Sequence, residues 1–74
     1  MRIRTKNSEY EISGGANQIV VKKIADFYKG GHPNVKVGDT HMGTRLFIEI
    51  GSELVLQNGG DHPFRTSPII GISA

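Results

Sequence analysis

Seventy-four residues are enough for one small domain, and a chain this short buries only about 60% of the surface that it exposes when unfolded. The absence of cysteine excludes disulfides and thiolate metal sites. Nine Lys and Arg against seven Asp and Glu give a net charge of +2, which is weak for a duplex-DNA binder and of the wrong sign for an acidic DNA mimic. No apolar run approaches the roughly 18 residues of a membrane helix, and no signal peptide opens the chain. We therefore expect a single β domain over 1–74, cytoplasmic (in the host cytosol if a phage encodes it) and without a membrane partner.

Short segments rich in Ile and Val, separated by ten glycines and three prolines, are typical of strands. Residues 2–6 alternate, with Ile3 and Thr5 on one face, and residues 9–13 alternate again. Asn7-Ser8 between them suits a turn or a bulge. The first 13 residues therefore predict two strands joined by a tight connection.

Residues 18–28 fit two interpretations. Apolar side chains fall at helical spacing, Asn17 could cap a helix and Gly30 could end it. The β-branched run at 19–21 is stiff at χ1 and favours a strand, which we expect, with a short helix near 18–28 as the alternative. Residues 30–43 then predict a loop region that contains a short strand at 35–37.

The clearest predicted element is a hairpin of residues 45–50 and 53–58 around a two-residue type II′ loop, Gly51-Ser52. That loop sets Ile48 opposite Val55 and Phe47 opposite Leu56, so both faces are substantially apolar. Either the hairpin curls through a small barrel or another subunit buries its second face. The residues expected to divide between core and subunit interface are Leu46, Phe47, Ile48, Leu54, Val55 and Leu56.

The C-terminal part predicts a turn cluster at 59–63 and a last strand at 69–73. Pro68 cannot donate to a ladder, so it marks the start of that strand or an edge. The fold expected from the whole pattern is all-β, with five to six short strands in a small barrel or a strongly twisted antiparallel sheet.

Neither a metal site nor a catalytic site is expected. The three histidines, His32, His41 and His62, show no ligand spacing and are predicted to be solvated loop residues. The residue types for nucleophilic catalysis occur without a recognisable framework. We therefore expect no enzyme activity, no metal and no cofactor.

Basic and hydroxyl side chains are more suggestive of ligand binding. Arg65 stands beside two hydroxyl residues and is a candidate phosphate contact, because a guanidinium pairs with phosphate bidentately. Aromatic rings beside glycine-proline loops are candidates for stacking on a base. A solvated strand face, a Thr/Ser turn and structural rings are the competing interpretation. The candidate ligand-binding residues are Arg4, Tyr10, Tyr28, Arg45, Phe64, Arg65, Thr66 and Ser67.

Two short motifs carry a resemblance. The run Thr5-Lys6-Asn7-Ser8-Glu9-Tyr10-Glu11 resembles the T-x-N-S-x-Y-E opening of small phage and bacterial hypothetical proteins, and Thr66-Ser67-Pro68 with Ile72 resembles their T-S-P ending. The similarity covers about the first dozen and the last ten residues. Phage sponge proteins that sequester cyclic-nucleotide immune signals are suspected among these proteins, which implies an oligomer that binds cyclic dinucleotides without cleaving them. The matching positions serve equally well as determinants of the fold.

We therefore expect a non-enzymatic phage-type protein that sequesters a small anionic nucleotide ligand at a homo-oligomer interface. The mild positive charge suits two phosphates better than a nucleic acid polymer. One alternative is an SH3-like protein-interaction module or an inhibitor of a host protein, and another is a small-barrel single-stranded nucleic-acid binder.

Overall fold

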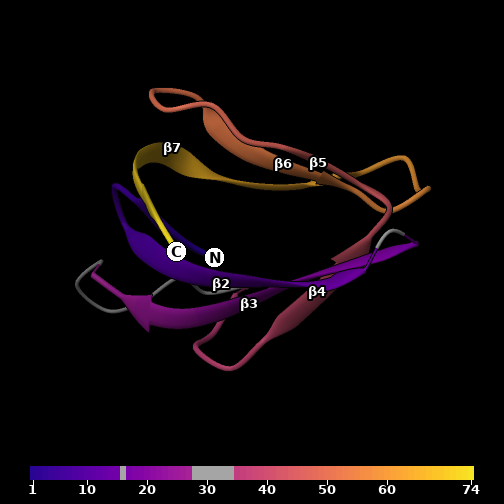
Figure 1. The fold of residues 1–74 in the computed structure, drawn as a ribbon, viewed down its shortest axis with the longest axis horizontal. Helices are drawn as coiled ribbons and strands as arrows, with labels where there is room; N and C mark the ends of the chain where they lie inside the picture. The colour runs from indigo at the N-terminus through magenta and orange to yellow at the C-terminus, as the bar shows by residue number, and fades with distance from the viewer. Residues whose placement is uncertain (16, 28–34) are drawn as a thin grey trace.

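The computed structural model describes residues 1–15, 17–27 and 35–74, and the regular elements in these ranges are all strands (Figure 1). The all-β prediction is confirmed, with seven strands in the described ranges where five or six were expected. No helix within the described ranges is long and apolar enough to cross a membrane. The strands are β1 (Arg2–Thr5), β2 (Ser8–Gly15), β3 (Gln18–Asp26), β4 (Thr40–Gly43), β5 (Arg45–Phe47), β6 (Glu53–Gln57) and β7 (Phe64–Ser73).

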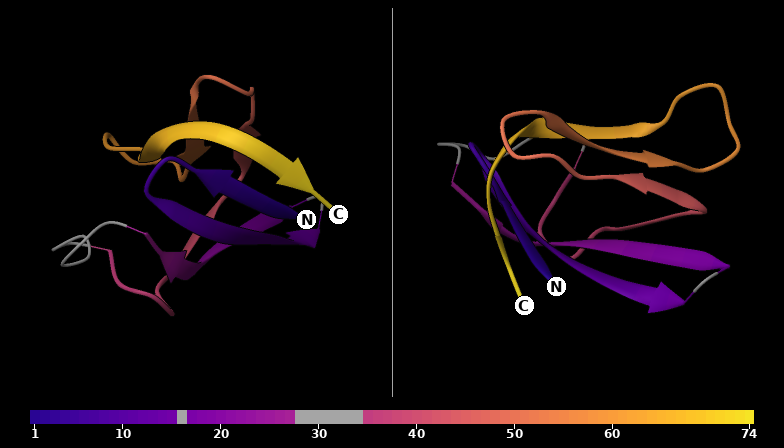
Figure 2. Two further views of the ribbon diagram at one scale, coloured as in Figure 1. Left: turned by 90° about the vertical axis from the view of Figure 1, so that its left-hand side faces the viewer. Right: turned by 45° about the horizontal axis from the view of Figure 1, so that its top comes forward.

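The strands form one antiparallel sheet in the order β4-β3-β2-β1-β7-β6-β5, which curls into an incomplete barrel. β7 is long enough to pair with β6 along its first half and with β1 along its second half, so it turns from one layer of the barrel into the other (Figures 1 and 2). The two edge strands, β4 and β5, are separated by Thr44 alone. The chain termini lie side by side, since Arg2 pairs with Ser73 (Figure 2).

The first half of the sheet follows the local sequence pattern. β1 and β2 form the predicted hairpin, in which Ile3 and Thr5 point into the core and the flanking arginines point out. The segment after it is a strand, β3, as the β-branched run indicated, and the helical alternative is wrong because that run pairs with β2 on one side and β4 on the other.

Two predictions for the middle and the end of the chain are wrong. Residues 35–37 lead into a turn in which Lys36 and Asp39 bond to one another, and the strand of this region is β4, within the predicted loop. The last strand begins at Phe64, not at 69, so Pro68 lies in mid-strand. The position tolerates proline because it falls where the pairing of β7 shifts register and passes from β6 to β1.

The β5–β6 hairpin has a different register from the predicted one. Leu46 pairs with Leu56 and Phe47 with Val55, one residue out of step, and β5 already ends at Phe47. The turn runs from Glu49 to Ser52, with Gly51 at φ +93°, and Gly51 and Ser52 bond to Ile69 in β7. Pairing with β7 therefore decides the register, and a one-residue slip exchanges the faces of a strand.

Burial in the core decides which of the predicted interface residues a partner could contact. Its buried apolar side chains are Ile3, Tyr10, Val21, Leu54, Leu56 and Ile69. Leu46 and Ile48 pack against this core, whereas Val55 is half-buried and Phe47 is 49% exposed on the outer face. The second face of the hairpin is therefore less apolar than predicted.

Gly43 lies where β4 and β6, from the two ends of the sheet, approach one another closely. A Cβ atom at this position would lie against the carbonyl oxygen of Gln57 and 2.8 Å from the side chain of Leu56, both in β6. We expect Gly43→Ala to lower the free energy of unfolding by about 1–3 kcal/mol, because overpacking at a rigid contact costs that much.

Urea unfolding at neutral pH measures this effect, with Gly15→Ala as the control. Gly15 also lies in a strand, but nothing lies within 4 Å of the corresponding Cβ position. Equal stabilities of the two variants would contradict the close approach of β4 and β6.

Candidate functional site

A cavity of about 460 Å³ opens between the β2–β3 part of the sheet and the start of β7. This volume lies within the range of about 300–1,000 Å³ that is usual for small-molecule sites. Its lining combines apolar, aromatic, hydroxyl and charged groups. The lining residues are Asn7, Ser8, Tyr10, Lys23, Asp26, Val35, Glu53, Pro63, Phe64, Arg65, Thr66 and Ser67.

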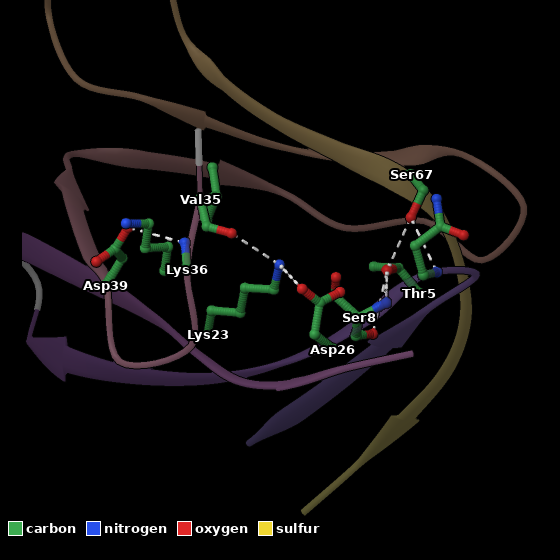
Figure 3. Close-up of polar contacts among 9 residues, drawn as sticks. Thr5, Ser8, Lys23, Asp26, Val35, Lys36, Asp39 and Ser67 are labelled. Carbon is green, nitrogen blue, oxygen red and sulfur yellow. Dashed lines mark hydrogen bonds and ion pairs between the residues drawn. The ribbon is translucent and has the colours of Figure 1, made fainter. Parts of the chain in front are cut away.

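Lys23 is the unusual member of this lining, because only 1% of its surface is exposed. Its ammonium donates to the carbonyl oxygen of Val35 at 2.9 Å and lies 3.1 Å from Oδ2 of Asp26 (Figure 3). Lysine is almost never buried so completely unless it is paired. The pairing satisfies this condition and places a cation at the wall of the cavity.

Local strand geometry aims both charges inward. Lys23 stands two residues after the buried Val21, so the alternation of side chains along a strand puts Lys23 on the inner face of β3, the same face as Val21. Tyr10 pairs with Lys23 and Glu9 with Ala25, so one extra residue, Ile24, forms a bulge. Asp26 then pairs with Ser8 and lies close enough to reach the ammonium.

Two rings of an aromatic cluster, Tyr10 and Phe64, form another part of the wall. Tyr10 meets Phe64 edge to face with ring centroids 5.9 Å apart, and His41 of β4 stacks on Phe64 at 3.9 Å. Burial raises the pKa of Tyr10, and the negative charge of Asp26 adds to that shift, whereas a hydrogen bond with Ser8 opposes it. The phenol therefore stays protonated and neutral at physiological pH.

His41 is not the solvated loop histidine that was predicted. It lies in β4, and its Nε2 is buried with no hydrogen-bond partner among the described residues. Burial lowers the pKa of His41, and the nearby charge of Asp39 opposes that shift only in part. The ring is therefore neutral above pH 6.5, and it stacks on one face of Phe64.

A hydroxyl cluster beside the cavity joins the two ends of the chain. Thr5 Oγ1 donates to the carbonyl oxygen of Ser8 and accepts hydrogen bonds from the amide of Ser8 and from Ser67 Oγ, the last at 2.9 Å (Figure 3). Ser67 Oγ also accepts from the amide of Asn7, and the amide of Lys6 donates to the Pro68 carbonyl. The two motifs of the resemblance thus bond directly to one another across about 60 positions, which gives them a structural role.

Among the described residues, the charges that line the cavity balance. Arg65 lies 3.5 Å from Glu53 in an exposed pair at the rim, and Lys23 pairs with Asp26 inside. Each of the two cations in the described part of the lining therefore has a carboxylate beside it. The exposed pair holds the guanidinium only weakly, because ion pairs at the surface contribute little free energy.

The structure brings most, but not all, of the predicted ligand-binding residues to the cavity. Five of them line the cavity: Tyr10, Phe64, Arg65, Thr66 and Ser67. Arg4 lies instead over the ring of Phe27 at 4.4 Å, and Arg45 is exposed on β5, away from the cavity lining. Tyr28 and the glycine-proline loop with His32 lie outside the described residues.

The hydroxyls of Thr66 and Ser67 do not have the expected geometry. Both belong to β7 and not to a turn before a strand. Thr66 Oγ1 donates to the carbonyl oxygen of Ser67 and accepts from the amide of Leu54, and Ser67 Oγ donates to Thr5. Since a hydroxyl has one proton, both are already used within the fold.

Neither Lys23 nor His41 was among the predicted ligand-binding residues. Lys23 could have been found, because it shares strand parity with Ile19 and Val21, a pattern typical of an inward-facing side chain. The burial of His41 follows from the packing of β4 near the start of β7, and no local pattern signals it.

Comparison with protein-family models, with curated proteins and with solved structures found no match to this chain. Among the described residues, no group of three or more His, Asp or Glu side chains converges in a way that could hold a metal ion.

The half-buried histidine, His41, predicts a pH dependence of stability. In the unfolded chain His41 protonates below its ordinary pKa of 6.5, whereas the folded chain resists protonation because its pKa is lowered. The unfolded state therefore binds more protons in this window, and stability present above pH 6.5 is lost as the pH falls toward the lowered value.

We expect the free energy of unfolding in urea to fall between pH 7.5 and pH 5, and to fall less in His41→Phe, which keeps a ring against Phe64. The control, His62→Gln, removes an exposed loop histidine and should retain the wild-type fall. A His41→Phe profile that parallels the wild type would show that another group causes the dependence.

Proposed function

We propose that this chain is a non-enzymatic binding protein that holds a small nucleotide-like ligand in the cavity beside Lys23. The observation that carries the proposal is a cavity of about 460 Å³ with a buried ammonium and an aromatic wall. Such a combination suits a ligand with a planar ring and oxygen acceptors. Burying a lysine in so small a core is costly, which supports a role for it beyond packing.

Binding without turnover is supported by the hydrogen bonds of the nearby hydroxyls. Thr5, Thr66 and Ser67 each donate their proton within the fold, so none of them has a proton positioned for a base to remove. The resemblance to phage proteins of the suspected sponge type favours a cyclic-nucleotide immune signal as the ligand. In that role the protein sequesters the signal in the host cytosol without cleaving it.

Calorimetric titration against cyclic dinucleotides, cyclic trinucleotides and mononucleotides tests the binding function. We expect at least one nucleotide to bind at nanomolar to micromolar concentration and to be recovered intact by chromatography. Silence across the whole panel would remove the proposal, and recovery of a cleaved nucleotide would replace it with catalysis.

Two exposed arginines make a matched pair in the same titrations. Arg65 lines the cavity and Arg45 does not. We expect Arg65→Gln to weaken the binding of a nucleotide by about two- to fivefold at low salt, the size expected for an exposed ion pair, and Arg45→Gln to leave it unchanged. Equal effects of the two substitutions would place the phosphate elsewhere.

We also propose that a second copy of the chain pairs with the edge strand β5 and covers the apolar side chains on the outer face of β5 and β6. β5 is an edge strand, so its outer backbone groups can pair with another strand, and an edge-to-edge contact closes under two-fold symmetry. Phe47 is half exposed beside Val55 on this face, which supports an apolar contact between copies.

Sedimentation velocity at micromolar concentration tests self-association. We expect a dimer or larger species for the wild type and a monomer for Phe47→Lys. Association should be unchanged in Val37→Lys, which alters an exposed apolar residue in the turn that bonds to β3. A wild-type protein that sediments as a single 8.1 kDa chain would overturn this proposal.

A further inference from the structure

Among the described residues, the ammonium of Lys23 has fewer acceptors than donors at the cavity wall. An ammonium carries three N–H donors. In the described part of the chain its acceptors are the Val35 carbonyl and Oδ2 of Asp26, and Lys23 also lines the cavity. A third donor on a side chain that is 99% buried is costly to leave without an acceptor, so a ligand atom that accepts it is stabilised.

The neighbouring charges decide what kind of acceptor fits. Asp26 already compensates the charge of Lys23 at 3.1 Å, and its side chain is itself largely buried. A phosphate brought to the same depth would add a second negative charge beside this carboxylate, where low polarity strengthens the repulsion. A neutral oxygen accepts the hydrogen bond without that cost.

We propose that Lys23 recognises an exocyclic oxo group on the planar base of the ligand, and that Arg65 at the rim meets its phosphate. This inference rests on the proposed binding function and specifies the ligand class as an oxo-base nucleotide, with hypoxanthine, guanine or uracil as its base. An amino base such as adenine presents a donor where the oxo base presents an acceptor, so it sets one donor against another and leaves the ammonium unsatisfied.

Two nucleotides that share a purine ring, ribose and phosphate isolate this contact. Inosine 5′-monophosphate carries an oxo group where adenosine 5′-monophosphate carries an amino group. We expect the wild-type protein to bind the inosine nucleotide at least roughly tenfold more tightly in calorimetric titration, the effect of one hydrogen bond to a charged group. We expect Lys23→Met to bring the ratio of the two dissociation constants close to one.

The control and a charge-balanced variant separate recognition from stability. Lys22→Met makes the same change on the exposed face of β3 and should keep the wild-type ratio. Lys23→Met removes the cation beside a buried carboxylate, which can destabilise the fold. The double variant Lys23→Met/Asp26→Asn removes both charges together, and circular dichroism confirms its fold before titration. It should also lose the preference.

The outcomes distinguish this inference from the function on which it rests. If the wild type binds both nucleotides equally, if it binds neither, or if the folded Lys23→Met variants retain the preference, the inference is overturned. The binding function is overturned only if the whole nucleotide panel is silent. A preference for the inosine nucleotide that survives Lys22→Met and disappears in both Lys23 variants supports the inference.

Discussion

Thr44 alone links the two edge strands of the sheet, and this constraint shapes the rest of the molecule. A flat sheet of seven strands would hold its edges far apart, whereas one residue spans less than about 4 Å. The sheet must therefore curl until the end of β4 reaches the start of β5. Gly43 permits that approach, because β6 occupies the space that a side chain would need.

Curling the sheet also creates the cavity and its buried charge. β7 must turn from the β6 layer into the β1 layer, and the residues at its start then face the inner side of β2 and β3. Lys23 lies on that inner side, where burial would be costly for an isolated ammonium. Its contacts with Asp26 and with the Val35 carbonyl offset the cost. The backbone of Lys23 bonds to Gly38 and Asp39 as well, so the same residue anchors the segment that leads into β4.

The parts of this fold that could be predicted from sequence are those governed by alternation within a strand. Ile3 and Thr5 reveal the inner face of β1 because neighbouring residues point in opposite directions. The β5–β6 register could not be obtained in this way, since Gly51 and Ser52 bond to β7 and a hairpin rule considers only the hairpin. Only one side of the cavity could be predicted from sequence, because its two sides meet through long-range strand pairing. Residues around Arg65 signalled a polar cluster, but the long-range pairing that faces them with Lys23 has no local signature.

The hydroxyl cluster changes what the resemblance to phage proteins can imply. Thr5 and Asn7 bond to Ser67, and Lys6 bonds to Pro68, where the first hairpin meets β7. These contacts maintain the junction through which the sheet curls. Residues with that role can be shared by any chain with this junction, whatever ligand it binds. The motifs therefore bear on the fold as well as on the resemblance, and the chemistry of the proposed ligand's base is inferred from positions outside them. Lys23 is such a position, since its depth and its compensated charge set a chemical requirement that the motifs do not.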